Sequence, residues 1–547
     1  MKPIDVGKIT VTPFVFDTIT EIKIEKRLNE HSTLYVCGII KDESKFTPVT
    51  SMTEGSNVKC ENDGAVYFDG VLQNIDVTCV EGVYHLKVYA VSNTILLDIV
   101  KHKRAFQDNG EDYKSIVEKV IADAGASVTY NADPLTVENI ILQYNETDWE
   151  FAKRLASHTQ DVLIPITASI PSFHFGATDA GGAELATGNF GTSRDFDALR
   201  SMVSQIDPLT ADDVTLYTVE TDEYLCDLGE KFTLNGADLR VCRLSLSLVE
   251  SAITIKYTLC GKRAVSGPKL YNRTITGLVL DGKVTEVEND TLKLDLSVDL
   301  ERGVELDTDE RHFYKYASGY TMEDHTGWYV MPEEHDTVQL IFPLEDEKFA
   351  YAASSVRRET TDRTIDHMVK YLRTSYGREL KMDKDEILLT AVDDDTFIRI
   401  NKNNGEGGNS LGIEIITPNR ISINSGSKIF ISSADDMSIT SGKNLYIEAK
   451  DNIHMVCGGN SMELDEKDGK GIIMSTDKEY HLLSEKDMVV ESKLNMGIKS
   501  KEDINVTSND AQIIVGADRK IEIACAGSSI MMDTSSMDIR SLMIKEN

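Results

Sequence analysis

The sequence lacks any apolar run of about eighteen residues, so no segment is expected to cross a membrane as a helix. Its first residues have no apolar core and no small-residue cleavage site, so no signal peptide is expected. Basic residues are few: 57 Lys and Arg stand against 91 Asp and Glu, a net charge of −34. A surface of this sign repels phosphate groups, which argues against nucleic acid or an anionic membrane as a partner.

Closely spaced cysteines are missing as well. The eight cysteines lie far apart in the sequence and form no Cys-x-x-Cys pair. This spacing predicts reduced thiols in a protein that folds in the cytoplasm, with no structural zinc site. No other metal site and no cofactor is expected.

Proline and aromatic residues nearly disappear from the C-terminal part of the chain. Ten of the eleven prolines lie at or before Pro343, and after residue 420 the aromatic residues are Phe430, Tyr446 and Tyr480. A long segment with so few rings and prolines is not an ordinary globular core. It is either disordered or repetitive, and the spacing of its apolar residues favours a repeat.

From residue 419 the chain repeats every eight residues. In each octad the third and fifth positions are apolar and the seventh is small. The series breaks at 459–471, returns, and changes phase by one residue before Ile513, so that its last inward pairs are Ser529 with Met531 and Met537 with Ile539. The residues expected to form the core of the repeat are Ile421, Ile423, Ile429, Ile431, Met437, Ile439, Leu445, Ile447, Ile453, Met455, Ile504, Val506, Ile521 and Ile523.

This alternation predicts one short strand per octad, with one face buried. Two medium-sized side chains per octad cannot form a core within one chain, and eight residues are too short for a rung of a single-chain solenoid. We therefore expect several intertwined chains, most simply three, with Phe430 and Tyr446 pointing outward. The alternatives are a single-chain solenoid and a disordered polar tail.

The rest of the chain is predicted to be β structure with a helical insertion. Residues 274–358 contain five short alternating segments and no helical pattern, which suggests a small barrel of the OB type. Residues 1–267 contain alternating segments on both sides of two helical stretches. One stretch runs from Asp112 to Ala124, and the other follows Thr147, a good N-cap.

Four segments carry a resemblance to the VgrG-type spike proteins of contractile tails. QYNETDWEFAKRLASH (143–158) resembles a motif of that family's hub domain, and residues 327–342 resemble the signature of its OB domain. TSYGRELKMD (374–383) resembles the passage into the family's needle, and the octads resemble the trimeric β-helix of phage spikes. His335 and Thr337 depart from the family, which has Gly and Glu there. The matching motif positions are Gln143, Tyr144, Phe151, Arg154, Leu155, Trp328, Pro332, Asp336, Val338 and Phe342.

The resemblance implies a mainly β chain in six parts. These are a first hub barrel (1–110), a helical insertion (111–164), a second hub barrel (165–267), an OB-fold domain (268–358), a neck (359–420) and an octad-repeat needle (421–547). It also implies a homotrimeric central spike that caps an inner tube, nucleates tube assembly at a baseplate and pierces a target envelope when the sheath contracts. The implied partners are a ring of tube protein, baseplate proteins and a small PAAR-like tip cap. Such a spike is assembled in the cytoplasm and leaves the cell on firing.

The last apolar residues are the expected contact with that cap. A prism that ends there exposes an apolar rung and unpaired strand edges, which are normally covered. The expected contact residues are Met537, Ile539, Leu542 and Ile544.

Enzyme motifs are missing from the sequence: it contains no GxSxG elbow, no HExxH and no P-loop. Only residues 359–420 separate the predicted barrel from the octads, too few for a lysozyme, so no enzyme activity is expected. The alternatives are a peptidoglycan-degrading hub enzyme and a trimeric receptor-binding fibre. Weak catalytic or metal candidates, for which a structural role fits better, are His335 with Asp336, Glu333 with Glu334, Cys457 after His454, and the loop 465–471.

Overall fold

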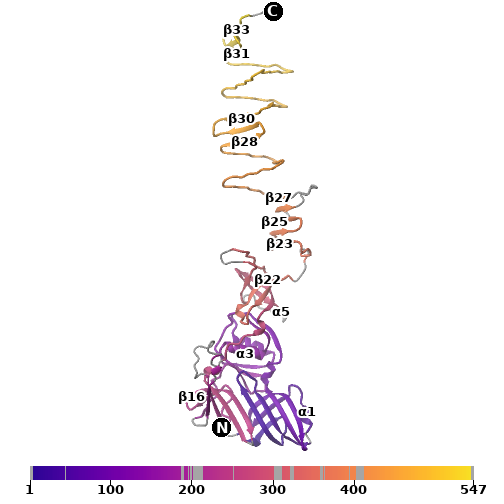
Figure 1. Cartoon of the computed structure of the whole chain (residues 1–547), viewed down its shortest axis with the longest axis vertical. Coiled ribbons are helices and arrows are strands. Elements are labelled where there is room, and N and C mark those ends of the chain that lie inside the picture. The colour runs from indigo at the N-terminus through magenta and orange to yellow at the C-terminus, as the bar shows by residue number, and fades with distance from the viewer. Residues whose placement is uncertain are drawn as a thin grey trace. The chain divides into compact units, whose positions relative to one another are not determined.

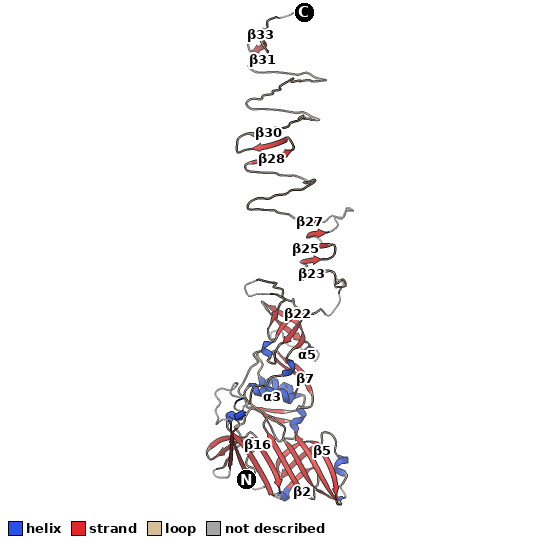
Figure 2. Cartoon of the chain, in the orientation of Figure 1, coloured by secondary structure: helices blue, strands red, loops and turns tan. Residues whose placement is uncertain are grey.

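β-Strands far outnumber helices among the described residues, as the alternating sequence predicts (Figures 1 and 2). The computed structural model describes residues 4–42, 45–185, 190–194, 196–197, 200, 214–249, 252–265, 267–300, 311–320, 326–357, 361, 364–392, 395–401 and 412–543. The chain divides into two units, Met1–Ser422 and Ile423–Asn547, which we describe one at a time. Among the described residues, no helix is long and apolar enough to cross a membrane.

A twelve-stranded sheet dominates the first part of unit one. Its strands follow the order β1-β4-β5-β6-β3-β2-β16-β17-β14-β13, and β15 pairs with both β16 and β12. In β3 every second side chain is buried, as expected for a strand with one face on a core. The strands are β1 (Ile9–Thr12), β2 (Thr18–Arg27), β3 (Thr33–Ile40), β4 (Asn57–Asn62), β5 (Ala65–Val80), β6 (Val83–Ser92), β12 (Ala183–Leu185), β13 (Phe190–Arg194), β14 (Thr215–Thr221), β15 (Lys231–Leu234), β16 (Ala237–Val249) and β17 (Ala252–Cys260).

The two strand sets that were expected as separate barrels meet in this sheet. β2 pairs with β16 in antiparallel register, with Ile22 opposite Leu248 and Ile24 opposite Leu246. These four side chains belong to one buried core that includes residues of both sets. The division into two barrels remains a prediction, but the pairing joins both sets into one sheet.

Both predicted helices are present. α2 (Tyr113–Ala122) has Asp112 as its N-cap, and α3 (Asp148–His158) begins after Thr147, which forms a capping box with Glu150. Buried apolar side chains of the two helices share a core with the strands around them. We call residues 101–175 the helical unit; its strands are β7 (Lys101–Phe106), β8 (Ser127–Tyr130), β9 (Ile141–Thr147), β10 (Leu163–Pro165) and β11 (Ser172–Phe175).

Five strands form the predicted small barrel, and the barrel is closed. The strand order is β18-β19-β20-β22-β21, and β21 pairs back onto β18. β20 and β22 run parallel, whereas the other neighbours run antiparallel. The expectation of no helix here was wrong, because α5 (Ser297–Leu300) follows β19 and the 3₁₀ turn η7 (Glu347–Phe349) precedes β22. The strands are β18 (Leu278–Glu288), β19 (Thr291–Leu296), β20 (Tyr314–Ala317), β21 (Thr337–Phe342) and β22 (Tyr351–Ser355).

A five-stranded antiparallel sheet follows the barrel in unit one. Several of its apolar side chains stay exposed, for example Leu389 at 49% and Ile398 at 39%. The sheet therefore lacks a full core of its own in a single chain. Its strands are β23 (Lys370–Arg373), β24 (Glu379–Met382), β25 (Glu386–Val392), β26 (Thr396–Asn401) and β27 (Gly412–Ile416).

Most octads form no strand pairing within the chain: residues 417–451 and 476–519, all of them described, have none. The extended segments turn at corners that the seventh-position serines build. At one corner the Ser425 hydroxyl accepts the N–H of Ser427 at 3.2 Å and donates to the carbonyl of Lys428 at 3.1 Å. The hydroxyls of Ser433, Ser441, Ser484 and Ser492 likewise donate to the carbonyl three residues ahead. The sequence analysis required only a small residue here, whereas the hydroxyl also fixes the corner.

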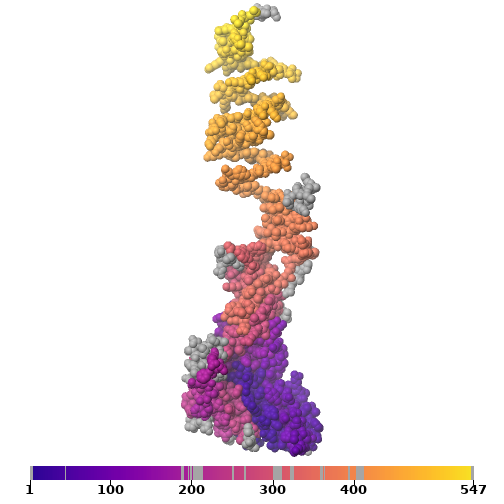
Figure 3. All heavy atoms as spheres, viewed as in Figure 1, coloured from indigo at the N-terminus to yellow at the C-terminus, as the bar shows by residue number. Residues whose placement is uncertain are grey.

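Two segments of unit two form three-stranded antiparallel sheets, which we call the meanders. In the space-filling view the first meander is a broad patch between thin bands of octad chain (Figure 3). The first meander lies at the break in the repeat that was predicted at 459–471. The first meander contains β28 (Asn452–Cys457), β29 (Asn460–Asp465) and β30 (Gly471–Ser475), and the second contains β31 (Lys520–Cys525), β32 (Ser528–Asp533) and β33 (Met537–Arg540).

The inward pair predicted for the octad before the last, Ser529 with Met531, is wrong, whereas the last pair, Met537 with Ile539, lies in the same cross-strand rows as Ile521 and Ile523. In the second meander Met531, predicted to face inward, lies opposite Glu522 and Asp538. The cause is a two-residue turn at Ala526 and Gly527, whose φ angles are 36° and 105°. Such a turn reverses the chain and starts an antiparallel hairpin, whereas an octad corner only bends it.

Candidate functional site

The motif at 143–158 spans β9 and α3 and centres on a buried guanidinium. Arg154 is 2% exposed. Its Nε and Nη2 donate to the two carboxylate oxygens of Glu146 at 2.9 and 2.8 Å, and Nη2 also donates to the carbonyl of Leu142 at 2.9 Å. Its Nη1 donates to Glu347 at 2.9 Å. Every terminal nitrogen therefore has an acceptor, which suits the rigid fork of an arginine.

Glu347 comes from the barrel, so Arg154 connects the barrel to the helical unit. Around this ion pair Ala105, Ile140 and Leu142 of the helical unit pack in the same core as the buried side chains of the barrel. We call these contacts the joint. Further hydrogen bonds cross it, among them Asn272 Nδ2 to the Tyr144 carbonyl (2.8 Å), Tyr314 Oη to Gln107 Oε1 (3.0 Å), and Ala105 N to Asp299 Oδ1 (3.3 Å).

The charges of the joint depend on one another. Burial alone would lower the pKa of Arg154, but the carboxylates of Glu347 and Glu146 raise it, so the guanidinium stays charged. Burial raises the pKa of Glu146, although Arg154 opposes this rise. Removal of one member would leave a buried charge without its partner, which is far more costly than removal of an exposed pair. The arrangement therefore holds two parts of the chain together.

A second polar cluster contains the motif residue Gln143. Arg104 Nη1 donates to Gln143 Oε1 at 3.0 Å and to Asp148 Oδ1 at 2.5 Å, and Gln143 Nε2 donates to Asp148 Oδ1 at 3.0 Å. All three side chains are buried. Asp148 is the first residue of α3, where a negative charge is favourable. Gln143 thus helps to position the start of the helix that carries Arg154.

His158 ends α3 and is held without charge. Tyr113 Oη lies 3.1 Å from Nδ1, and the carbonyl of Leu270 lies 3.0 Å from Nε2. The tautomer with its proton on Nε2 satisfies both contacts, because Nε2–H donates to the carbonyl and Nδ1 accepts from the tyrosine hydroxyl. Burial, and after it the positive charge of Arg154, lowers the pKa of His158 to about 3.

The remaining motif residues divide between core and surface. Phe151 and Leu155 are buried in the helical unit, and Val338 and Phe342 are buried in the barrel. Trp328 is 74% exposed and belongs to none of these cores. Pro332 is buried, and Asp336 closes a turn by accepting the Glu333 N–H at 2.9 Å.

The weak catalytic candidates near the barrel lie in an exposed turn. His335 has a φ of 75°, and its side chain and those of Glu333, Glu334 and Asp336 are exposed. The carboxylate of Asp336 is already engaged by the backbone of this turn. The residues are therefore arranged as a solvated turn, as the sequence analysis favoured.

The candidates in unit two lie on an exposed strand and in a turn. His454 and Cys457 lie on β28 with exposed side chains. The loop 465–471 is a turn in which Asp465 Oδ1 accepts the Asp468 N–H at 2.9 Å. Within the described part of the chain, no group of three or more His, Cys, Asp or Glu side chains could hold a metal ion.

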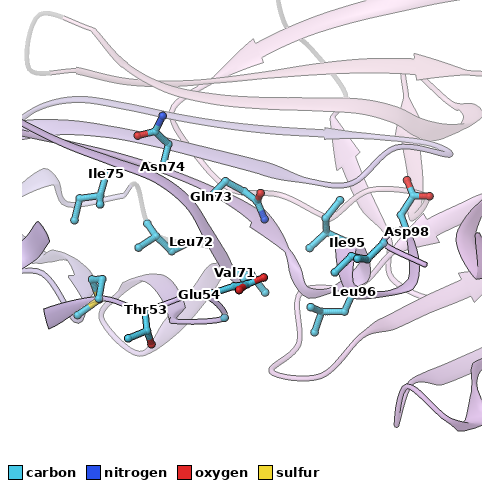
Figure 4. A pocket seen from close by; sticks show the side chains of 13 residues that line it. Thr53, Glu54, Val71, Leu72, Gln73, Asn74, Ile75, Ile95, Leu96 and Asp98 are labelled. Atoms are coloured by element: carbon cyan, nitrogen blue, oxygen red, sulfur yellow. The ribbon is translucent and has the colours of Figure 1, made fainter. Parts of the chain in front are cut away.

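A groove of about 880 Å³ lies over β5 and the turn η3 (Asn93–Leu97) (Figure 4). Its lining is largely apolar and includes Leu72, Ile75 and Leu96. Asp98 at its edge accepts a hydrogen bond from Thr147 and lies 3.2 Å from His31. The groove can accept apolar side chains, and of its two acidic residues, Glu54 and Asp98, Asp98 is already engaged.

The predicted needle-core residues are mostly exposed in the single chain, and the degree of exposure depends on octad position. Met437 in a third position is 50% exposed, whereas its fifth-position partner Ile439 is 70% exposed. Met496 and Ile498 show the same difference, at 50% and 73%. The fifth position therefore depends most on a partner outside the chain. Of the expected cap contacts, Met537 and Ile539 lie in β33 and Leu542 is fully exposed, whereas Ile544 lies outside the described residues.

Arg154→Met should destabilise the helical unit strongly, by about 3–5 kcal/mol, because it leaves two buried carboxylates without their partner. Denaturant unfolding, followed by the fluorescence of Trp149 in α3, would measure the loss. Lys114→Met removes an exposed pair with Glu118 and should cost less than about 1 kcal/mol. The triple variant Arg154→Met, Glu146→Gln, Glu347→Gln should recover part of the loss. Equal effects of the Arg154 and Lys114 variants would contradict the role given to the joint.

His158 should make the helical unit less stable in mild acid. Its folded pKa lies below the unfolded value of about 6.5, so its contribution is complete above that pH and is lost as the pH falls toward about 3. Between about pH 6.5 and 5 the loss is about 2 kcal/mol. Urea unfolding at both pH values should show a smaller loss for His158→Gln, while His335→Gln, in the exposed turn, should behave as the parent does. If His158→Gln lost as much unfolding free energy in acid as the parent does, His158 would not be the cause of the acid sensitivity.

Comparison with known proteins gives matches to a bacterial family and to tail proteins. A family model described as "Uncharacterized protein conserved in bacteria" (DUF2345) matches residues 410–541, the region of the octads and meanders. No curated protein matches the sequence.

Three solved structures illustrate the similarity. The E. coli c3393 protein, described as a component of the type VI secretion system with structural similarity to the T4 bacteriophage tail proteins gp27 and gp5, is 12% identical, with a TM-score of 0.45 over 64% of this chain and 100% of that one. The Francisella PdpA–VgrG complex is 8% identical, with a TM-score of 0.46 over 73% of this chain and 84% of that one. A 43 kDa prophage tail protein of Shewanella oneidensis is 12% identical, with a TM-score of 0.38 over 47% of this chain and 98% of that one. As its motifs predict, the chain resembles VgrG-type spike proteins.

Proposed function

We propose that this protein is the structural central spike of a contractile injection machine and assembles as a homotrimer. The observation that carries the proposal is the exposure of the octad side chains: Ile431, Ile439 and Ile447 are 73%, 70% and 62% exposed in one chain. Soluble proteins rarely leave such a long apolar series uncovered. Further copies of this chain are the best cover, because they present the same period of eight residues.

The backbone of the octads supports the same conclusion. Residues 417–451 and 476–519 have no strand pairing within the chain, and backbone N–H and C=O groups need partners once they are buried. If chains wind together about an axis, each octad can pair with octads of its neighbours while its apolar positions turn inward. Three is the smallest number of walls that encloses an axis, and such a closed prism leaves no strand edge along its sides.

The barrel would form a collar between hub and needle. Its first strand pairs with the second and fourth strands, and its third pairs in parallel with the fifth, which supports an OB-type barrel. The joint at Arg154 and the shared core hold the barrel directly against the helical unit. A push on the helical unit would therefore reach the barrel directly.

In this proposal the spike caps the inner tube, nucleates tube assembly at the baseplate and pierces the target envelope when the sheath contracts. The assignment to a contractile injection machine rests on the sequence motifs that resemble those of VgrG-type spikes. Its partners would be a ring of tube protein and baseplate proteins at the hub, and a small cap at the tip near Met537 and Ile539. The spike would assemble in the cytoplasm and leave the cell on firing.

The spike would act mechanically, without a catalytic step. Zymography of the purified chain on peptidoglycan should therefore show no cleared band. A cleared band at the position of the chain would support the rival proposal of a peptidoglycan-degrading hub enzyme. A catalytically unrelated protein purified in the same way would control for contaminating hydrolases.

Ile439→Asp should weaken the needle far more than Ser438→Asp. The first variant places a carboxylate on the apolar axis of each chain, at a cost of about several kcal/mol per copy. The neighbouring Ser438 lies at an outward position, where Asp should cost less than about 0.5 kcal/mol. Thermal unfolding of the trimer would measure both effects. A folded monomer of 60.8 kDa in light scattering, or equal effects of the two variants, would contradict the proposed assembly.

A further inference from the structure

The octads are so alike that they do not define one alignment between chains. Throughout 419–458, and again throughout 486–509, the third and fifth positions are apolar and the seventh is small. If one chain slipped by eight residues against another, apolar side chains would still meet apolar side chains and corners would still meet corners. A strand register that side chains do not specify is prone to such slippage.

The two meanders lack this ambiguity. Each meander presents six apolar side chains on one face, arranged in two rows across its three strands, whereas an octad presents only two. In the first meander the rows are Ile453, Leu464 and Ile472, then Met455, Met462 and Met474. In the second meander the rows are Ile521, Met532 and Met537, then Ile523, Ile530 and Ile539.

The apolar face of each meander continues the inward positions of the octads before it. Ile453 and Met455 in β28 hold the third and fifth positions of an octad, and Ile521 and Ile523 hold the same positions in β31. Whatever covers the octads must therefore also cover the meanders. Under the proposed function, that cover is the other copies of this chain.

We propose that the two meanders hold the three chains in register. This inference rests on the proposed trimer. In register, three identical six-residue faces meet across the axis. After a slip of one octad, the meander of one chain faces single octad strands of its neighbours, and most of its apolar residues lose their partners. A slip that leaves the octads unaffected is thus penalised at both meanders.

The hub cannot provide this alignment alone, because it fixes only the point at which each chain enters the repeat. Farther along, one chain could loop out an octad and continue in the wrong register, since closing an eight-residue loop costs little conformational entropy. Every later octad would then pair again. The meanders at 452–475 and 520–540 flank the octads between them and oppose such an error on both sides.

Disulfides between chains at two fifth positions can report the register. Val490 and Val506 lie two octads apart. In an aligned prism their strands are two spacings of about 4.8 Å apart, beyond the Cβ–Cβ distance of about 4 Å that a disulfide needs. Val490→Cys and Val506→Cys would be carried on separate full-length chains that are produced together, and mass spectrometry would identify the linked peptides. With both meanders present, we expect no link between positions 490 and 506.

The test variant replaces both meanders with octads of the same chain. One copy of residues 427–450 replaces 451–477 and another replaces 519–542, and both replacements keep the eight-residue phase. In this variant we expect the link between positions 490 and 506 to appear. The matched control inserts the same copy between residues 450 and 451 and keeps both meanders, so it should show no link.

Each outcome decides between specific alternatives. A trimer of the double replacement without the link, or a link in the control, would overturn the register proposal. Variants that replace only one of the two meanders should still form trimers; loss of the trimer in either of them would also overturn the proposal, because that meander would then be needed for assembly itself. A monomeric parent chain in light scattering would instead refute the proposed trimer, before any register is measured.

Discussion

The unpaired octad is the constraint on which the C-terminal unit depends. Each octad offers two apolar side chains and one short strand, which is too little to bury anything within one chain. In the proposed trimer a narrow shared interior would explain the scarcity of rings, and Phe430 and Tyr446 are the most exposed of the large apolar side chains in their octads, at 86% and 85%. The scarcity of proline follows from the same constraint, because proline cannot donate to the backbone ladder that neighbouring chains would complete.

The joint differs from the octads, because it depends on specific polar partners rather than on repeated apolar contacts. Arg154 satisfies Glu146 and Glu347 together, and the core around them includes residues of both the helical unit and the barrel. A buried ion pair adds little stability relative to an apolar core, but it tolerates no rearrangement that separates its members. Such a joint is suited to fixing the angle between two parts of a chain. The octads, in contrast, would be stabilised by many repeated contacts, but these contacts do not specify one register between chains.

The sequence was sufficient to predict helices and strands wherever the residues that specify them are close together in the chain. Thr147 with Glu150 marks the start of α3, and the alternating segments of 278–355 indicate the strands of the barrel. The barrel partner of Arg154 could not be predicted, because Glu347 lies 193 residues away and nothing local connects them. The pairing of β2 with β16, which joins the two strand sets, is hidden for the same reason.

The second meander shows a different limit. Its turn at Ala526 and Gly527 has the composition of an octad corner, a small residue followed by glycine, yet two positive φ angles turn it into a hairpin. Composition therefore separates corners from strands but does not separate a bend from a reversal. At the serine corners, hydrogen bonds of the serine hydroxyls mark a bend that composition alone does not identify. Because Ser425 and its equivalents bend the chain through their own hydroxyls, each chain would lose part of its conformational freedom before the proposed trimer forms. That lowers the entropy that association must overcome.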